Sequence, residues 1–379
     1  MKNILIVAHL GDLSGANLAL VELVEELKKS KKFNILVMLP KKGELSNYLN
    51  DHCIDYIVLR SGMWVKRKEE NFCKTIVKQV LNFIGEYKFR SILKKFNIHL
   101  VHYNTSVYGV GVRTLYKSGK IPYIFHIREF AKNVFNLDFY DEQQSMFLIS
   151  QSEAIITVSK SIEKYFSNIL KIDNIRTIYD GIPLLSNKKI VRKFDVPEIL
   201  MVGAIAQDKG QLEAIQAIKI LKNIFPNIKL TVIGKTLEKD YRERIDKFII
   251  ENKLQKHISI DRYRRDLTKL REQYDFVYVC SKNEAFGRVT VEALQFGQIV
   301  FGANTGGTKE IINDKKNGFL YEQGNSMDLA RKFLEVFQNE SLKVDVSSEA
   351  WVSSRKVFDI NKSVELIRKL YIEVLNDYE

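Results

Sequence analysis

The sequence contains few of the residues that interrupt or cross-link a fold. Only 5 of its 379 residues are proline, well under the usual ~5%, so regular helices and strands are expected to dominate. Its three cysteines, Cys53, Cys73 and Cys280, lie far apart and form no CxxC pair. We therefore expect neither a disulfide framework nor a zinc site, and the composition fits a reducing compartment.

Membrane-spanning and secretory segments are also missing. No apolar run reaches the ~18 residues that a spanning helix requires. The opening residues MKNILIVAHL have the lysine and short apolar run of a signal peptide, but no small-residue cleavage site follows. We interpret Ile4 to Ala8 as a first buried strand. The expected location is the cytoplasm, and peripheral contact with the inner face of the membrane stays open.

Acidic residues are in deficit. The chain has 59 Lys and Arg against 46 Asp and Glu, a formal charge of +13. Such a surface favours an anionic partner, which can be a nucleic acid, an acidic membrane or a phosphorylated substrate. No aromatic RNA-binding signature and no recognition-helix motif is present, so we expect no nucleic acid partner. The sequence has no HExxH motif and no Asp-x-Asp pair, and we expect no metal.

The remaining pattern predicts an α/β chain with two domains. Length alone favours two. Apolar strands such as Phe33–Leu39 and Tyr123–Ile127 alternate with segments long enough for crossover helices, which predicts a parallel sheet covered on both faces. After a polar, basic stretch the alternation restarts. We expect two Rossmann-like doubly wound domains, residues 1–184 and 185–357, followed by an amphipathic terminal helix within residues 358–379.

The most informative segment follows a predicted strand in the second half. Glu284 and Glu292 are eight residues apart, and Gly287 lies between them, just before a helix that we expect to start near Arg288. The N–H groups of that helix start would suit a phosphate, and both carboxylates would bind neutral hydroxyl groups. A phosphate flanked by hydroxyl groups describes a sugar nucleotide. The spacing by itself, however, favours two unrelated surface acids.

Three further segments offer groups for such a ligand. Lys209 follows a strand that ends near Gly203 and can place a charge on a diphosphate. Ser14 and Gly15 lie at the first strand-to-helix turn, where small residues again suit phosphate. His126 ends a strand and can donate or accept a hydrogen bond. Each of these signals is weak alone, because a solvated lysine or a structural histidine is the commoner case.

Together these residues resemble the GT-B retaining glycosyltransferases of the group 1, or family four, type. The specific match is EAFGRVTVEALQFGQIVFGANTGGTKEII, residues 284–312, which fits the family pattern E-x-F-G-x-x-x-x-E-A. The Gly-Gly-x-x-Glu run at Gly306, Gly307 and Glu310 continues it. Val202-Gly203 with Lys209-Gly210 resembles the family's V-G-R…K-G element, and Ser14-Gly15-Ala16 its amino-terminal glycine loop.

The resemblance implies a fold and an activity. The fold is GT-B, with two domains facing across a cleft and a C-terminal helix that crosses back to the first. The activity is that of a metal-independent, retaining hexosyltransferase. It would move a sugar from a nucleotide-diphosphate sugar, such as a UDP-sugar, to a glycan or lipid-linked acceptor in surface polysaccharide or glycan biosynthesis. The nucleotide sugar is a co-substrate, and no cofactor is expected.

The same resemblance assigns roles to residues of this chain. Glu284, Lys209 and His126 would be catalytic, with Glu284 and His126 contacting the transferred sugar. Glu292 would bind the ribose. The remaining residues expected to bind the donor are Ser14, Gly15, Gly203, Phe286, Gly287, Arg288 and Val289.

The chain departs from the family pattern in places that keep other functions open. Ala204 stands where the family often has an arginine that helps to hold the diphosphate, and Asp180 stands where asparagine is usual. No clear counterpart of the glycine near the base is found around Arg262 to Arg265. A non-catalytic partner subunit and a GT-B sugar-nucleotide epimerase therefore remain alternatives.

Residues 60–95 carry ten basic and three acidic residues, a net charge of +7 that is over half of the total. Aromatic and aliphatic residues are interleaved with these charges. Such a segment suits an anionic membrane or a lipid-linked acceptor, and we expect this face to include Trp64, Lys66, Arg67 and Lys68. A core-facing apolar side with solvated lysines is an equal alternative.

Overall fold

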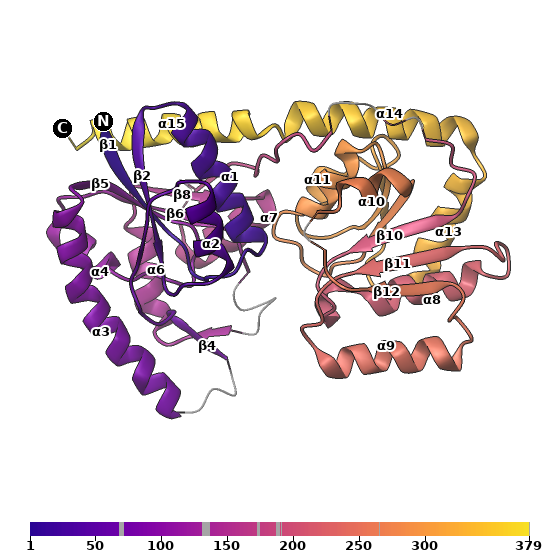
Figure 1. The fold of residues 1–379 in the computed structure, drawn as a ribbon, viewed down its shortest axis with the longest axis horizontal. Coiled ribbons are helices and arrows are strands. Elements are labelled where there is room, and N and C mark those ends of the chain that lie inside the picture. Colours follow the sequence, from indigo (N-terminus) through magenta and orange to yellow (C-terminus); the bar gives the residue numbers. More distant parts are fainter. Residues whose placement is uncertain are drawn as a thin grey trace. The chain divides into compact units, whose positions relative to one another are not determined.

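The computed structural model describes residues 1–67, 72–130, 137–172, 175–186, 190, 192–264 and 266–378, without the side chains of residues 67 and 72–75. The chain divides into two compact units (Figure 1). Unit 1 contains Met1–Gly181 and Ile360–Glu379, and unit 2 contains Ile182–Asp359. The predicted boundaries after residues 184 and 357 lie within three residues of this division.

Unit 1 is built around a parallel sheet. Its described strands follow the order β3-β2-β1-β5-β6-β8-β9, and every pair is parallel. Burial on both faces explains why these strands are continuous apolar runs. The strands are β1 (Lys2–Val7), β2 (Phe33–Leu39), β3 (Tyr56–Val58), β5 (Ile98–Tyr103), β6 (Tyr123–Ile127), β8 (Ala154–Thr157) and β9 (Ile175–Thr177). A separate antiparallel pair joins β4 (Val65–Arg67) and β7 (Leu137–Phe139).

The helices of unit 1 connect and cover these strands. They are α1 (Gly15–Lys29), α2 (Glu44–Asp51), α3 (Phe72–Lys95), α4 (Val112–Ser118), α6 (Glu142–Ser150), α7 (Lys160–Leu170) and α15 (Ile360–Asn376). The last helix of the chain, α15, packs against α1 and β5, and its apolar side chains join the core of unit 1. Tyr371 on this helix is fully buried. The expected return of the C-terminal helix to the first domain is thus confirmed.

Unit 2 repeats the same design. Its described strands follow the order β12-β11-β10-β13-β14-β15, again with parallel pairs throughout. These strands are β10 (Glu198–Val202), β11 (Lys229–Ile233), β12 (Ile258–Asp261), β13 (Phe276–Val279), β14 (Ile299–Ala303) and β15 (Phe319–Tyr321). The helices are η1 (Gln207–Lys209), α8 (Gln211–Leu221), α9 (Lys239–Glu251), α10 (Thr268–Gln273), α11 (Arg288–Gln295), α12 (Thr308–Ile311), α13 (Ser326–Phe337) and α14 (Glu340–Val357).

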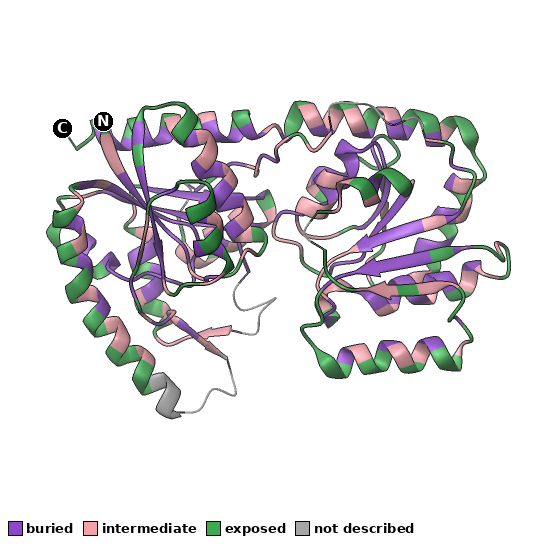
Figure 2. Cartoon of the chain, viewed as in Figure 1, coloured by how far each residue is buried: buried purple, intermediate pink, exposed green. Residues whose placement is uncertain are grey.

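Each unit has its own apolar core. Figure 2 shows the buried strands, in purple, and the helices with exposed outer faces. The core of unit 2 is rich in aromatic contacts, such as the T-shaped pair of Phe276 and Phe333 with ring centroids 5.2 Å apart. Of the helices within the described ranges, none combines the length and hydrophobicity needed to cross a bilayer.

Candidate functional site

The candidate site of unit 2 lies where β10 and β13 end. Residues from the end of β10, from β13 and the loop that follows it, and from the start of α11 line one small cavity. In doubly wound sheets, ligands bind beyond the carboxyl ends of the strands. Among the residues predicted from the sequence, Gly203, Lys209, Glu284, Gly287 and Val289 are all part of this lining.

Two oppositely charged side chains, Lys209 and Glu284, line the cavity. Lys209 Nζ donates a hydrogen bond to Glu284 Oε2 at 2.9 Å, and about a quarter of each side chain is exposed. Burial acts to lower the pKa of Lys209, but attraction to Glu284 and Asp208 outweighs it and the pKa is raised. Burial likewise acts to raise the pKa of Glu284, yet Lys209 and a hydrogen bond from Ser281 hold it below its ordinary value. Both groups are therefore charged at neutral pH.

Close backbone packing brings the two loops together. Gly210 adopts a positive φ of 71°, and a Cβ at this position would lie 2.3 Å from the carbonyl oxygen of Cys280. Only glycine allows so close an approach. The loop after β14 supports the loop that carries Glu284, because Gly307 N donates to the Glu284 carbonyl oxygen at 2.7 Å. A Cβ at Gly307 would lie 2.1 Å from the carbonyl oxygen of Phe286.

Glu292 lies one turn into α11 and is held by two arginines. Arg271 Nη2 donates to Glu292 Oε2 at 2.7 Å, and Arg288 Nη2 lies 3.6 Å from Glu292 Oε1. The Arg271 side chain is only 1% exposed, whereas Glu292 is 18% exposed. A fully buried guanidinium requires such a partner. The carboxylate is therefore oriented before any ligand arrives.

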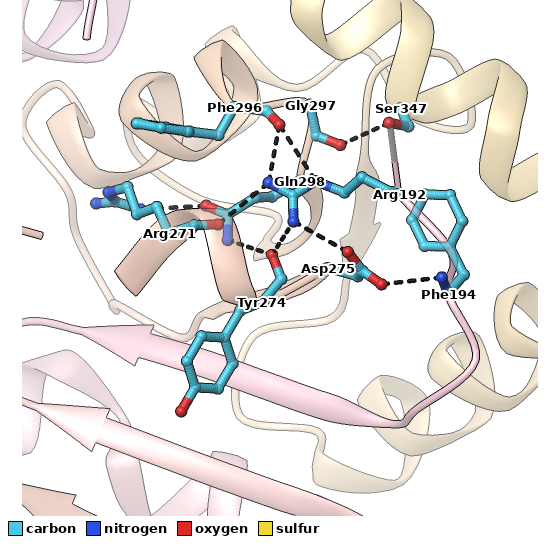
Figure 3. A network of polar contacts seen from close by, with 9 residues as sticks. All are labelled: Arg192, Phe194, Arg271, Tyr274, Asp275, Phe296, Gly297, Gln298 and Ser347. Atoms are coloured by element: carbon cyan, nitrogen blue, oxygen red, sulfur yellow. Dashed lines mark hydrogen bonds and ion pairs between the residues drawn. The ribbon is translucent and has the colours of Figure 1, made fainter. Parts of the chain in front are cut away.

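A network behind the site fixes Arg271 in turn (Figure 3). Arg192 Nη2 donates to the Arg271 carbonyl oxygen at 3.1 Å, and Arg192 Nη1 donates to Asp275 Oδ1 at 2.9 Å. Gln298 accepts from Arg271 Nη1 at 3.4 Å and donates to the Tyr274 carbonyl oxygen at 2.7 Å. Arg192 lies in the polar, basic stretch between the two predicted domains. Its side chain is only 1% exposed, and it donates hydrogen bonds to the carbonyl oxygens of Arg271, Tyr274 and Phe296.

Two further residues near this loop differ in their surroundings: Phe286, which was predicted to bind the donor, and Thr290, which was not. Phe286 is buried and packs edge-on against Phe358, with ring centroids 5.8 Å apart. Thr290 lines the cavity, and its buried Oγ1 has no hydrogen-bond partner among the described residues. The sequence reading did not single out this hydroxyl group, which is available to a ligand oxygen.

In unit 1, Ser14 and Gly15 lie at the start of α1. Gly15 is the first helical residue, and Ser14 precedes it in an extended conformation. Ser14 Oγ donates to Asp12 Oδ1 at 2.9 Å instead of capping the helix.

His126 lies near the carboxyl end of β6 and is 1% exposed. Burial lowers the pKa of His126 far below its ordinary value, and the charges of Arg128 and a neighbouring histidine act in the same direction. The imidazole is therefore neutral. Its ring stacks against His102 with centroids 5.4 Å apart.

Comparisons with known proteins bear on the whole chain. Residues 186–351 match the sequence pattern of the family Glycosyl transferases group 1, and residues 13–184 match that of Glycosyltransferase Family 4. An uncharacterized glycosyltransferase of Methanocaldococcus jannaschii is 30% identical over 295 residues, which cover 77% of this chain and 80% of that protein. The chain belongs to the group 1 glycosyltransferases. The family expected from residues 284–312 is thus confirmed.

One further sequence relative and one solved structure are similar to this chain. The capsular polysaccharide biosynthesis glycosyltransferase CapM of Staphylococcus aureus is 26% identical over 244 residues, covering 59% of this chain and 63% of CapM. The crystal structure of Anabaena HepE in complex with UDP-glucose matches with a TM-score of 0.79 at 20% identity, covering 98% of this chain and all of HepE. This likeness confirms the GT-B fold of the glycosyltransferase.

The predicted acceptor face of this glycosyltransferase is only partly within the described residues. Lys68 lies outside them, and of Arg67 only the backbone in β4 is described. Trp64 is half-buried, and its ring lies 6.2 Å from that of Phe125. Lys66 Nζ lies 5.8 Å from the centre of the Tyr140 ring.

The described residues hold no group of three His, Cys, Asp or Glu side chains that would bind a metal ion. Sequence reasoning missed Arg271 as the partner of Glu292, because the segment around it reads as an ordinary surface helix. It also missed the buried ion pair of Arg128 and Asp180, whose Nη1 and Oδ2 atoms are 2.5 Å apart. Such pairs leave no local pattern in a sequence.

Proposed function

We propose that this glycosyltransferase transfers a sugar from a UDP-sugar with retention of anomeric configuration and without a metal ion. The observation that carries the proposal is the Lys209–Glu284 pair in the cavity at the carboxyl ends of β10 and β13. A cation next to a helix start can bind the diphosphate. Glu284 lies in the loop before α11, and Glu292 lies on α11 itself. The carboxylate of Glu284 would bind hydroxyl groups of the sugar, and that of Glu292 would bind those of the ribose.

The proposed chemistry is electrostatic. Negative charge develops on the departing diphosphate, and preorganised positive groups stabilise it in the transition state. Lys209 is already charged, and Arg288 at the first position of α11 adds a second cation. These groups would supply the charge that a metal ion supplies in other enzymes. They would also replace the arginine that this chain lacks at Ala204.

UDP as the nucleotide is supported by HepE, which was solved with UDP-glucose. Polysaccharide synthesis as the context is supported by CapM. A glycan or lipid-linked acceptor and a location at the cytoplasmic face of the membrane belong to the same proposal.

A donor screen tests the activity. The protein is incubated with UDP-sugars and other nucleotide sugars, with and without EDTA, and released nucleotide is measured. We expect turnover of a UDP-sugar that EDTA does not abolish. Lys209→Ala and Glu284→Ala should lower kcat by about 100- to 1,000-fold, the usual cost of removing a preorganised charge. Lys316→Ala, an exposed lysine of unit 2, is the matched control and should have full activity.

Other outcomes separate the alternatives. Conversion of one UDP-sugar into its epimer would identify an epimerase. Absence of turnover and of UDP binding in both wild type and variants would favour a non-catalytic subunit. Inversion of the product anomer, read by proton NMR, would reject the retaining mechanism.

The surface of α3 supports an acceptor presented on a membrane. Four apolar residues, Ile76, Val80, Phe83 and Tyr87, recur at helical spacing and are 44%, 52%, 80% and 75% exposed. The opposite side of the helix is buried through Phe89. We call these four residues the α3 stripe. Large apolar residues on a solvent face mark an interaction surface.

Charge selects the kind of partner. Basic residues that are exposed accompany the α3 stripe along the last turns of the helix: Lys88, Arg90, Lys94 and Lys95. An amphipathic helix with basic flanks binds anionic lipid, and the attraction grows with each basic residue near the surface. We therefore propose an anionic membrane surface as the occupant of the α3 stripe.

Flotation with vesicles tests the membrane contact. The wild-type protein should float with vesicles that contain phosphatidylglycerol and not with phosphatidylcholine alone. Phe83→Ser with Tyr87→Ser should abolish flotation and leave UDP binding intact. Ile250→Ser removes an apolar residue of unit 2 that is 64% exposed and should float normally. Absence of wild-type flotation would reject the membrane contact, and concentration-dependent dimers broken by the α3 variant would identify a second copy as the occupant.

A further inference from the structure

Arg128 lies at the centre of a buried polar cluster in unit 1. Its guanidinium side chain is 4% exposed. Arg128 Nη1 donates to Asp180 Oδ1 at 2.6 Å and to Oδ2 at 2.5 Å. Arg128 Nε donates to Asn104 Oδ1 at 2.6 Å. These bonds fix the plane of the guanidinium group on two sides, so its remaining nitrogen has a defined direction.

That remaining nitrogen faces a histidine. Arg128 Nη2 lies 3.4 Å from His126 Nδ1 in hydrogen-bonding geometry. A guanidinium group has five N–H donors and no acceptor. His126 Nδ1 must therefore be the acceptor, and it carries no proton. Because the same imidazole is neutral, its single proton must be on Nε2.

The Nε2 atom of His126 is a donor without a partner. It is buried and forms no hydrogen bond within the described residues. A buried donor without an acceptor is unfavourable, so a ligand oxygen that accepts from Nε2 would stabilise the complex. The ring lies near the carboxyl end of β6, the edge at which doubly wound sheets bind ligands.

The neighbouring histidine shows why Arg128 matters. His102 Nδ1 lies 2.5 Å from the Tyr371 hydroxyl oxygen. A hydroxyl group can donate or accept, so this contact leaves the tautomer of His102 open. The contact of His126 with a guanidinium group leaves one tautomer only.

We propose that Arg128, held by Asp180 and Asn104, is a positioning residue that fixes His126 as the Nε2–H tautomer, so that His126 acts on the donor sugar as a hydrogen-bond donor and not as a base. The functional part of this inference rests on the proposed contact of His126 with the sugar. The tautomer itself is a property of the free protein. The two parts can therefore be tested separately.

NMR spectroscopy tests the tautomer without substrate. The protein is labelled with 15N-histidine, and a long-range 15N–1H spectrum shows which ring nitrogen of each histidine carries the proton. The signals of His126 are identified by their loss in His126→Gln. We expect a protonated Nε2 and a bare Nδ1 at neutral pH. A protonated Nδ1, or a charged ring, would overturn the proposal.

Variants of the cluster test the part played by Arg128. Arg128→Met removes the donor, and we expect His126 to show a mixture of tautomers or a protonated Nδ1. The double variant Arg128→Met with Asp180→Asn should show the same change in the His126 tautomer. It leaves no unpaired buried carboxylate, so it serves if the single variant does not fold. Asp180→Asn alone keeps an acceptor for Arg128 and should keep the Nε2–H tautomer. An unchanged spectrum in both Arg128 variants would overturn the proposal.

Arg176→Met is the matched control. Arg176 forms an exposed ion pair with Glu373 in the same unit, with Nη2 and Oε1 2.6 Å apart. Its loss removes an arginine and a carboxylate contact without touching the buried cluster. The histidine spectrum should remain that of the wild type.

Kinetics tests the use of the donor. A glutamine amide can place an N–H near the position of Nε2, whereas asparagine can place one only near Nδ1. We expect His126→Gln to retain kcat/KM within about tenfold of wild type, and His126→Asn to lose about 100-fold, the range of one hydrogen bond to a charged or strongly polar partner. Equal losses in both would overturn the donor role. A wild-type spectrum as expected, with full activity in both variants, would instead reject the sugar contact of the proposed function.

Discussion

At the scale of single residues, the site of unit 2 is a set of charges that satisfy one another in the absence of ligand. Lys209 bonds to Glu284, and Glu292 bonds to Arg271. A donor diphosphate would compete with Glu284 for Lys209. The hydroxyl groups of the donor's sugar would then donate hydrogen bonds to the Glu284 carboxylate in place of Lys209. Donor binding as proposed would therefore exchange one set of polar contacts for another and keep the charged groups paired in both states.

A double-mutant cycle measures the strength of the Lys209–Glu284 pair. Lys209→Met and Glu284→Gln should each lower the free energy of unfolding by about 1 kcal/mol, because each leaves a partly buried charge unpaired. The double variant should lose less than the sum of the two. Urea unfolding at pH 7 gives the four values. Strict additivity would show that the pair is not coupled.

The pH dependence of this pair has a definite sign. The pKa of Glu284 is lowered in the folded protein, so its contribution is present above the unfolded pKa of 4.5 and is lost as pH falls through the lower, folded value. The pKa of Lys209 is raised, so its contribution is present below 10.5 and is lost at higher pH. The coupling free energy should be constant between pH 6 and 9 and decline below pH 4.5. The same urea series at several pH values checks this.

Buried neutral histidines should make the protein sensitive to mild acid. Burial, followed by the charge of Arg128, lowers the pKa of His102 to about 3. The unfolded chain binds a proton below 6.5, and the folded protein does not. The contribution of each such histidine to the free energy of unfolding is then fully present above pH 6.5. Below pH 6.5 it falls by about 1.4 kcal/mol per pH unit. His102→Gln should reduce that slope by one proton in unfolding measurements between pH 5 and 7.

The site residues that could be predicted from the sequence are those that lie close together along the chain. Glu284, Gly287 and Glu292 form a contiguous pattern, and their positions follow from one loop and one helix. Arg271 is 21 residues from its partner Glu292, and Arg128 is 52 residues from Asp180. Those pairs arise from the sheet order and not from the local chain, so no spacing rule identifies them.

At the scale of secondary structure, α10 and α11 together hold the carboxylate of Glu292, which we propose to bind the ribose. The buried guanidinium of Arg271 on α10 reaches Glu292 on α11. The network of Arg192 behind it holds α10 through the Arg271 carbonyl oxygen. The short helix α10 is thereby tied to the sheet by polar contacts.

Removal of Arg271 should weaken nucleotide binding more than catalysis. Arg271→Met frees Glu292 from its main partner, so we expect the KM for the donor to rise about tenfold and kcat to change little. Arg331→Met is the control, because Arg331 is 63% exposed on α13. Steady-state kinetics and UDP calorimetry check both variants. A large fall in kcat with unchanged KM would contradict this role.

The prediction of secondary structure was most accurate for the buried strands. The predicted strands Phe33–Leu39 and Tyr123–Ile127 agree with the structure residue for residue. The pair of β4 and β7 was not predicted, because three-residue strands lack a recognisable period. The helix α3 shows a further limit. Phe83 and Phe89 look alike in sequence, yet Phe83 is 80% exposed and Phe89 is buried, because apolar residues occur on both sides of this helix.

At the scale of the whole molecule, the two units repeat one construction, and α15 completes the first. Val364, Ile367, Leu370 and Val374 of α15 enter the core that also contains Ile4 and Leu20. Unit 1 is therefore discontinuous in sequence. The alternation of strands and helices was enough to predict two domains, whereas the side chains that α15 covers required the structure.

Truncation tests this dependence. A chain that ends at Asp359 lacks α15 and exposes the apolar surface beneath it. We expect unit 1 to lose its hydrogen-exchange protection while unit 2 keeps its own. Val352→Ser, an exposed position on α14 that is 48% accessible, serves as a control for changes near the C-terminus. Full protection of unit 1 in the truncated chain would show that α15 is dispensable.

The discontinuity of unit 1 also sets an order of events during synthesis. Residues 1–181 leave the ribosome first, but the helix that closes their core follows the 178 residues of unit 2. At about 5–20 residues per second, this delay lasts roughly 10–35 s. During that interval the nascent chain exposes the apolar surface that α15 will cover. Chaperone binding to ribosome-bound chains should therefore persist until the last helix has emerged.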